Sequence, residues 1–272
     1  MNIVLASDEK YLMAAETLIR SLLVNNDCEC RVYLLYADLA RQQLDSFAFT
    51  VCGLSDRLSL HFIKIDDRLF ENVPSIVGLP RTSYYRFLLP EVLPADVDRA
   101  LYLDCDIVIH NPIDAFYHMD FNGRLFVACE DIGVSVQHKY EFLTIYGRMN
   151  KPLCNGKYFN AGVMLFNMEL AREMIDMKEV RAMIDTYRPY IFFMDQDILN
   201  FMYGPYTMYA DYRYYNLGAG YLTGEEFSEA VRKAAVIHYY GHPDVKPWLD
   251  RRGVDSPLPA TRLWWNYAKK SP

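Results

Sequence analysis

The chain of 272 residues lacks the features that mark several large classes of protein. It carries 28 basic and 35 acidic side chains, a net charge of -7, and so has no basic excess for nonspecific binding to nucleic acid. No apolar run approaches the ~20 residues of a membrane-spanning helix, and no basic segment of a signal peptide opens the chain. The sequence therefore predicts a cytoplasmic protein without a nucleic-acid partner.

The placement of cysteine and glycine excludes two common kinds of site. None of the six cysteines belongs to a CxxC pair, and Cys28 and Cys30 stand too close together for a zinc knuckle. We expect all six to be reduced, in agreement with a cytoplasmic protein. The first predicted strand, residues 2–6, is followed by Ser-Asp-Glu-Lys and not by GxGxxG. A nicotinamide-dependent oxidoreductase is therefore disfavoured.

What the sequence does contain is an alternation of strand-like and helical segments. Short apolar runs predict strands at residues 2–6, 31–36, 58–65, 101–103, 125–129, 159–166 and 236–240. Apolar residues at helical spacing predict helices at residues 12–24, 39–51, 83–89, 168–187 and 192–202. This order predicts an α/β fold with a mixed, mostly parallel sheet flanked by helices. We expect one main domain, residues 1–245, and a basic, aromatic tail, residues 246–272.

The most informative stretch is the apolar run at residues 100–109, which holds Asp104 and Asp106. Residues two apart in an extended backbone project to the same side, so both carboxylates should enter one small volume. Two ionised carboxylates in a desolvated place repel each other unless a cation offsets their charge. Because Mg²⁺ and Mn²⁺ prefer oxygen ligands, the pair predicts a divalent metal site. Cys105, between them, is expected to point away and pack.

Polar side chains also stand at the ends of other predicted strands, where open α/β sheets bind ligands. They include Asp8, Asp131 and His238. His238 is followed by Gly241 and Lys246, a pattern that fits a metal ligand and then a phosphate clasp. A hydrogen-bonded core histidine is the alternative.

Two further motifs are open to two interpretations each. Residues 160–163, Asn-Ala-Gly-Val, indicate close packing either against a ligand or against another strand. Residues 195–197, Asp-Gln-Asp, stand near the start of a predicted helix, where acids also complement the helix dipole.

Together and in this order, the motifs resemble family 8 retaining glycosyltransferases, the group of bacterial lipopolysaccharide galactosyl- and glucosyltransferases and of glycogenin. The matching segments are residues 6–8 with Tyr11, 83–86, 101–106, Asp131, 159–163, 195–200, 214–216 and 238–248. They extend over nearly the whole chain. The resemblance implies a GT-A fold, a UDP-hexose donor and Mn²⁺, with Mg²⁺ as a substitute.

The resemblance also implies a role for each matching residue. The implied metal ligands are Asp104, Asp106 and His238. The implied uridine pocket is Ala6, Asp8 and Tyr11, and the implied diphosphate clasp is Gly241 and Lys246. The implied donor-sugar shell is Arg86, Asp131, Asn160, Ala161, Asp195 and Gln196. Residues 242–245 make the link within the clasp longer than the Gly-Ser-Ala-Lys type associated with bacterial galactosyltransferases.

The implied activity is metal-dependent transfer of galactose or glucose from a UDP-sugar to a saccharide or glycolipid acceptor, with retention, in cell-surface glycan or lipopolysaccharide synthesis. Gln196 is a poor nucleophile, and the family role of Asp195 is to hold sugar hydroxyls. We therefore expect front-face attack, with Gln196 steadying the positive sugar. A nucleotide-sugar-binding protein without transfer activity and a self-glucosylating enzyme like glycogenin are the alternatives.

Two regions keep open interpretations. The tyrosines within residues 203–221 fit an acceptor subsite or a tyrosine-rich core and rim. The tail from residue 246 holds all three tryptophans and several basic residues. It fits either peripheral contact with the inner face of a membrane or packing against the body of the protein.

Overall fold

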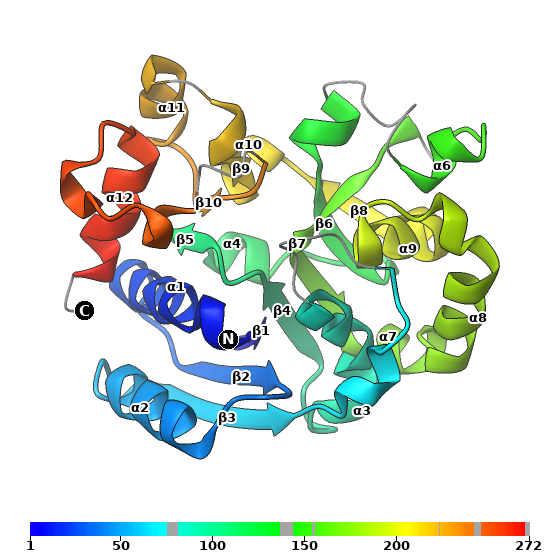
Figure 1. Ribbon diagram of the computed structural model, residues 1–272, viewed down its shortest axis with the longest axis horizontal. Coiled ribbons are helices and arrows are strands. Elements are labelled where there is room, and N and C mark those ends of the chain that lie inside the picture. The colour runs from blue at the N-terminus through cyan, green and yellow to red at the C-terminus, as the bar shows by residue number, and fades with distance from the viewer. Residues whose placement is uncertain (75–80, 137–143, 154–155, 223, 242–245, 270–272) are drawn as a thin grey trace.

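The computed structural model describes residues 1–74, 81–136, 144–153, 156–222, 224–241 and 246–269. Its architecture is α/β, as predicted, with one large sheet, one small sheet and helices on both faces (Figure 1). Cys154 and residues 242–245, to which the sequence analysis gave roles, lie outside this part of the chain.

The large sheet has the strand order β3-β2-β1-β4-β7-β6-β8. Its strands are β1 (Asn2–Ala6), β2 (Cys30–Tyr36), β3 (Leu58–Lys64), β4 (Arg99–Leu103), β6 (Phe126–Glu130), β7 (Phe159–Asn167) and β8 (Thr207–Ala210). Only the pairings of β7 with β4 and β6 are antiparallel. The small sheet has the order β5-β10-β9, from Ile107–Ile109, Val236–His238 and Leu217–Gly218.

The two faces of the large sheet bury two separate apolar clusters. Along β1, Ile3 and Leu5 enter one cluster while Val4 and Ala6 enter the other, as the two-residue period of a strand requires. The first cluster includes α1 (Leu12–Asn25), α2 (Arg41–Cys52) and α12 (Pro259–Ala268). The second includes the 3₁₀ segment Arg81–Leu88, α3 (Leu89–Val92), α7 (Met168–Met174), α8 (Met177–Tyr187) and α9 (Met194–Tyr203).

The shorter helices connect these elements, and the one that contains Tyr117 lies at the amino ends of β1 and β4, where Asn2 N donates to Tyr117 Oη and Arg99 donates to Tyr117 O. They are α4 (Asp114–Tyr117), α6 (Ile145–Arg148), α10 (Tyr212–Tyr215) and α11 (Gly224–Ala230). In Figure 1, α10 and α11 lie beside the small sheet, and α6 lies beyond β6 on the other side of the molecule.

Three predicted elements differ from the structure. The helix predicted over residues 168–187 is two helices, because Ile175 is extended and Asp176 caps α8 by accepting from Lys178 N at 2.7 Å. The helix predicted over residues 83–89 is mostly 3₁₀. The last strand ends at His238 and not at residue 240, although Tyr239 N still donates to Asp106 O, the next position of the register with β5.

The C-terminal segment packs against the body of the protein. Trp264 of α12 is fully buried in the cluster that contains α1, and Trp265 Nε1 donates to Pro247 O at 2.9 Å. The packing interpretation therefore holds for Trp264, while the division of the chain at residue 245 stays a prediction. Within the described ranges, no helix combines the length and apolarity needed to span a bilayer.

Candidate active site

The site lies where the two sheets join. Strand β4 ends at Leu103 and β5 begins at Ile107, and the residues between them form a bend. Asp104 N donates to Gly162 O of β7 at 2.8 Å, which ties one end of the bend to the large sheet. The two carboxylates do converge, but the reason predicted from an extended backbone was wrong, since the chain changes sheets between them.

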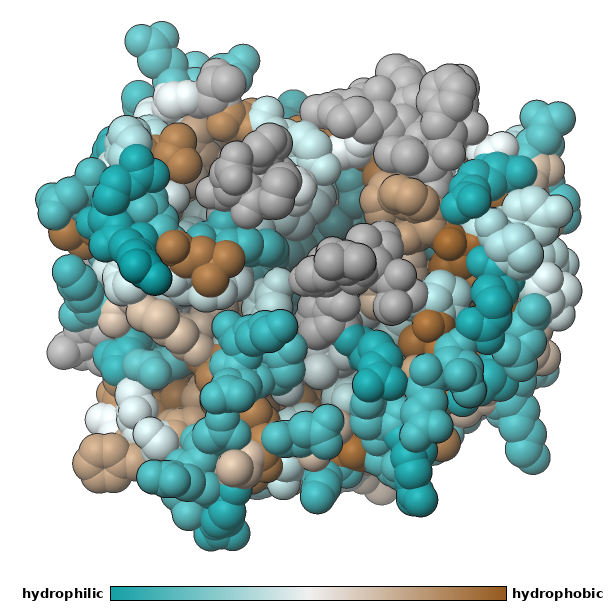
Figure 2. Space-filling model, viewed as in Figure 1, coloured by the Kyte–Doolittle hydropathy of each residue, from teal (hydrophilic) through white to brown (hydrophobic). Residues whose placement is uncertain are grey.

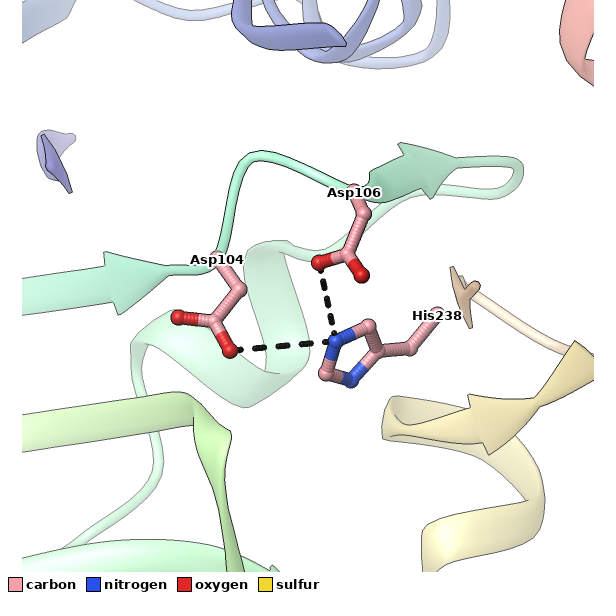
Figure 3. A group of neighbouring side chains, drawn as sticks. All are labelled: Asp104, Asp106 and His238. Atoms are coloured by element: carbon pink, nitrogen blue, oxygen red, sulfur yellow. Dashed lines mark hydrogen bonds and ion pairs between the residues drawn. The ribbon is translucent and has the colours of Figure 1, made fainter. Parts of the chain in front are cut away.

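Asp104, Asp106 and His238 meet at this joint (Figure 3). One ligand atom from each lies within 4.8 Å of the others. His238 Nε2 is 3.1 Å from Asp106 Oδ1 and 3.8 Å from Asp104 Oδ2. The sequence prediction that these side chains share one place is confirmed, although they come from β10 and from the bend between β4 and β5.

The surroundings of this cluster fit a small divalent cation. The donor set is two carboxylates and one imidazole, a combination found around such ions. Gly162 leaves the space open, because a Cβ there would lie 2.2 Å from His238 Cε1 and 2.7 Å from Asp104 Oδ2. When bound, the ion would supply Lewis-acid stabilisation of negative charge on a phosphate oxygen.

Lys246 brings a fixed positive charge to the same cluster. Its Nζ donates to Asp106 Oδ2 and, at 3.1 Å, to Tyr239 O. Burial raises the pKa of Asp106, but the Lys246 ammonium and His238 outweigh burial and hold that pKa well below its usual range. The ammonium also lies 5.9 Å from the ring centroid of Tyr11, the last residue of the 3₁₀ helix Glu9–Tyr11. Asp106 is therefore held as an anion next to the Lys246 ammonium.

Asp8 and Tyr11, predicted for the uridine pocket, follow the carboxyl end of β1. Asp8 Oδ1 accepts from Lys10 N at 3.0 Å and from Tyr11 N at 3.2 Å. The Tyr11 ring meets the Trp248 ring edge-on, with 5.3 Å between centroids. Burial, and then the charges of the nearby aspartates, raise the pKa of Tyr11.

Arg86, Asp104 and Asp195 form what we call the ion-pair half of the site. Arg86 is only 2% exposed. Its guanidinium lies 2.9 Å from Asp104 Oδ1 and 3.0 Å from Asp195 Oδ2, and it also donates to Ala161 O. The guanidinium lies over the ring of Tyr102, with 4.2 Å between Arg86 Cζ and the ring centroid. Burial raises the pKa of Asp195, and Arg86 opposes that rise.

Asp131, Asn160, Asn216 and Gln196 form the amide half. Asp131 Oδ2 accepts from Asn160 Nδ2 at 2.9 Å and from Gln196 Nε2 at 3.2 Å. Gln196 Oε1 accepts from Ala161 N at 2.9 Å. Burial raises the pKa of Asp131, against the effect of these donors. The amide half reaches the metal cluster through Asn216 and His238, whose Oδ1 and Nδ1 are 2.9 Å apart.

Residues 195–197 divide between the site and the fold. Asp197 is fully buried and accepts from Ile145 N, Phe192 N and Phe193 N, so it holds the start of α9. Met194, the first residue of α9, has a φ of 51°, a strained value for a non-glycine residue. This left-handed residue turns the helix start so that Asp195 and Gln196 face the two halves.

Ala6 and Gly241 make other contacts. Cys105 is buried and its thiol donates to Ala6 O at 3.2 Å, as expected for a packing side chain. Gly241 has a φ of 103° and lies against Tyr221, where a Cβ would be 2.8 Å from the ring.

The face of the molecule that is turned to the viewer in Figure 1 is hollowed near its centre, over the positions of β6 and β7 (Figure 2).

Sequence reasoning gave no site role to three residues that the structure brings to the cluster: Asn216, Gly162 and Tyr102. Asn216 and Gly162 stood inside motifs that carried the resemblance, which was the available signal. Tyr102 also stood inside a matching segment, residues 101–106, although its place in an apolar strand by itself predicts only packing.

Comparison with known proteins places this site in a family. The family model described as glycosyl transferase family 8 matches residues 2–252. Glycosyltransferase GlyF of Streptococcus pneumoniae is 26% identical over 98% of this chain and 61% of its own length. Lipopolysaccharide 1,2-glucosyltransferase of Escherichia coli is 24% identical over 91% of this chain and 72% of its own length.

The solved structure of the galactosyltransferase LgtC in complex with donor and acceptor sugar analogs is similar throughout. It has a TM-score of 0.80 and 25% identity, with 100% of this chain and 98% of LgtC covered. The fold is thus that of a GT-A glycosyltransferase. The chain belongs to glycosyl transferase family 8.

Proposed function

We propose that this glycosyltransferase moves a hexose, galactose or glucose, from a UDP-sugar to a saccharide acceptor with retention of configuration. The observation that carries the proposal is the convergence of Asp104, Asp106 and His238 within 4.8 Å at the joint of a family 8 fold. The ion we propose there is Mn²⁺, with Mg²⁺ as a weaker substitute.

The proposed donor site extends to both sides of this cluster. Ala6, Asp8 and Tyr11 would hold uridine, and Lys246 with Gly241 would hold the diphosphate. The Lys246 ammonium lies close to both Asp106 and the Tyr11 ring, which supports a diphosphate position between the metal cluster and the uridine pocket. A positive charge placed in advance where negative charge develops on departing UDP lowers the activation barrier by several kcal/mol, a gain on the order of 10²-fold in rate.

For the sugar, we propose that Arg86, Asp131, Asn160, Ala161 and Asp195 hold the hydroxyls and that Gln196 steadies positive charge at the anomeric carbon. The ion pair of Asp195 with Arg86 at 3.0 Å supports a positioning task for that carboxylate, and hence front-face attack. One solved LgtC structure is of an active-site mutant with glutamate in place of glutamine. Full activity of Gln196→Ala would remove the role of Gln196, and a sugar adduct on Asp195 would remove front-face attack.

A donor screen tests the proposal. UDP-glucose, UDP-galactose and other UDP-sugars are incubated with the full chain, with and without Mn²⁺, and released UDP is measured. We expect metal-dependent release from one hexose donor and an α-configured product by NMR. A UDP-sugar that binds but stays intact would point to the non-catalytic alternative, and sugar found on the protein by mass spectrometry would point to self-glycosylation.

The proposed acceptor is a saccharide or glycolipid of the cell surface, as the names of the lipopolysaccharide-synthesising relatives suggest. For contact with a membrane, the C-terminal segment offers Leu249, which is 70% exposed, beside the exposed Arg251 and Arg252. We propose that this segment touches the inner face of an anionic membrane. Sedimentation with anionic vesicles should fall for Leu249→Ser with Arg251→Ser, and equal sedimentation of this variant and the parent chain would reject the contact.

A further inference from the structure

A line of buried polar side chains leads away from the metal cluster. From His238 Nδ1 it passes to Asn216 Oδ1, from Asn216 Nδ2 to Asn160 Oδ1, and from Asn160 Nδ2 to Asp131 Oδ2, each step 2.9 Å. The four residues are at most 4% exposed, so bulk water does not compete along the line. Each amide in it has its oxygen toward His238 and its nitrogen toward Asp131.

The direction of the line is set at its far end. Asp131 Oδ1 accepts from Gly133 N at 2.8 Å and Val134 N at 3.0 Å, while Oδ2 accepts from Asn160 and Gln196. A carboxylate that accepts four hydrogen bonds has no donor to offer. Asn160 must therefore present its NH₂ group to Asp131.

The choice made at Asn160 propagates to the histidine. With its NH₂ group on Asp131, Asn160 presents its oxygen to Gly162 N and to the NH₂ group of Asn216. Asn216 then has only its oxygen left for His238. An oxygen accepts, so His238 Nδ1 carries a proton and Nε2 faces Asp104 and Asp106.

We propose that Asn216 is a positioning residue that, through Asn160, lets the Asp131 carboxylate select the nitrogen with which His238 binds metal. The proposal rests on the metal site of the proposed function. A ligating imidazole nitrogen must be free of its proton, and partners of the opposite nitrogen decide which one that is. The backbone of Asn216 is held separately, by donation from its N to Tyr212 O at 3.0 Å, so its side chain is free for this task.

The test measures the affinity of the full chain for Mn²⁺ in the absence of any sugar donor. The concentration of free Mn²⁺ is measured by its electron paramagnetic resonance signal. Asn216→Ala should weaken affinity about 10–100-fold, the usual effect of losing a partner of a metal-bound histidine. Asp131→Asn should also weaken it, by less than Asn216→Ala, because then only Gly162 N keeps the Asn160 side chain in its orientation. Asn216→Asp keeps an oxygen on His238 Nδ1 but sets a second acceptor against Asn160 Oδ1, so its affinity should fall between those of Asn216→Ala and the parent chain.

Asn26→Ala is the matched control. Asn26 is 8% exposed, donates to Leu22 O and accepts from Ile113 N, both at 2.9 Å, far from the cluster. This variant should unfold at a lower temperature and bind Mn²⁺ as the parent chain does. Affinity of Asn216→Ala within twofold of the parent chain, or an equal loss in Asn26→Ala, would overturn the role of Asn216. A parent chain that binds no Mn²⁺ would instead overturn the proposed function.

Discussion

The two halves of the site bury polar side chains equally deeply and stabilise them by different means. In the ion-pair half, Arg86 and Asp195 are 2% and 5% exposed, and opposite charges 3.0 Å apart compensate each other. In the amide half, Asp131 and Asn216 are 3% and 0% exposed, and one carboxylate is compensated by neutral donors. The first arrangement depends on the number of charges and the second on the direction of hydrogen bonds.

This difference has consequences for mutation. Removal of one charge from a buried pair leaves the other uncompensated, so the ion-pair half should lose stability steeply. A neutral hydrogen-bonded chain can be reversed or interrupted at smaller cost, so the amide half should lose function before it loses stability. The two halves meet at the metal cluster, because Asp104 pairs with Arg86 of the ion-pair half and His238 contacts Asn216 of the amide half.

The largest expected effect is on the ion-pair half. Arg86→Met leaves Asp195 buried without its cation and should lower the free energy of unfolding by about 3–5 kcal/mol in urea titrations. Arg31→Met, which removes a 2.9 Å pair with Asp96 from side chains 48% and 65% exposed, should cost less than about 1 kcal/mol. If both variants lost the same amount, burial of the pair would not matter and the contrast between the halves would disappear.

The next effect separates the two aspartates of the cluster. Asp106→Asn, a change of similar shape, should lower metal-dependent UDP release by at least about 10²-fold. It should also lower the unfolding midpoint, because the Lys246 ammonium loses the buried carboxylate with which it pairs. Asp104→Asn should lose similar activity at a smaller cost in stability, because its side chain is 31% exposed and Arg86 keeps Asp195 as its partner. Calorimetry beside the UDP assay checks both, and equal stability of the two variants would mean that the deeper burial of Asp106 does not matter.

A smaller effect is expected where the halves touch. Gly162→Ala places a Cβ 2.2 Å from His238 Cε1, so the ring must shift, at about 1–3 kcal/mol of stability and with weaker Mn²⁺ binding. Gly224→Ala, where no atom lies within 4 Å of the added Cβ, is the control and should bind Mn²⁺ normally. Unchanged Mn²⁺ affinity in Gly162→Ala would mean that the halves do not need this clearance.

The smallest effect is the pH dependence of the amide half. Burial raises the pKa of Asp131, so the folded protein keeps a proton that the unfolded chain has already lost. The resulting stability is fully present below the unfolded pKa of ~4 and is lost as pH rises through the folded pKa, about 1.4 kcal/mol per unit of difference. Urea titrations across this window should show that the stability of the parent chain relative to Asp131→Asn declines as pH rises. Parallel curves would contradict burial as the cause.

Much of the fold and part of the site could be predicted from local patterns. The period of two along β1 divides Ile3 and Leu5 from Val4 and Ala6, and the structure buries the two pairs on opposite faces. The aspartate pair at the end of β4 marked the cluster, and the resemblance supplied His238 as its partner. Such signals are readable because side-chain period and strand-end position depend on neighbours in the chain.

Other features depended on contacts between distant residues. The break at Ile175 divides a helix whose apolar spacing is continuous, and the bend between β4 and β5 replaces the extended backbone assumed for Asp104 and Asp106. Asp195 and Asp197 have the same side chain and stand two residues apart. Asp197 accepts hydrogen bonds from backbone amides, whereas Asp195 pairs with Arg86.

The sequence by itself determined most strands of the large sheet and the main helices around it, the family, and which residue types could meet at the rim of the sheet, since these follow from periodicity and motif order. Only the tertiary structure decided that Asn216 adjoins His238, that Gly162 leaves room beside it, and that one guanidinium serves two carboxylates. These contacts join residues from separate strands and helices. Their distances are set by the order in which the strands pair, which no local pattern records.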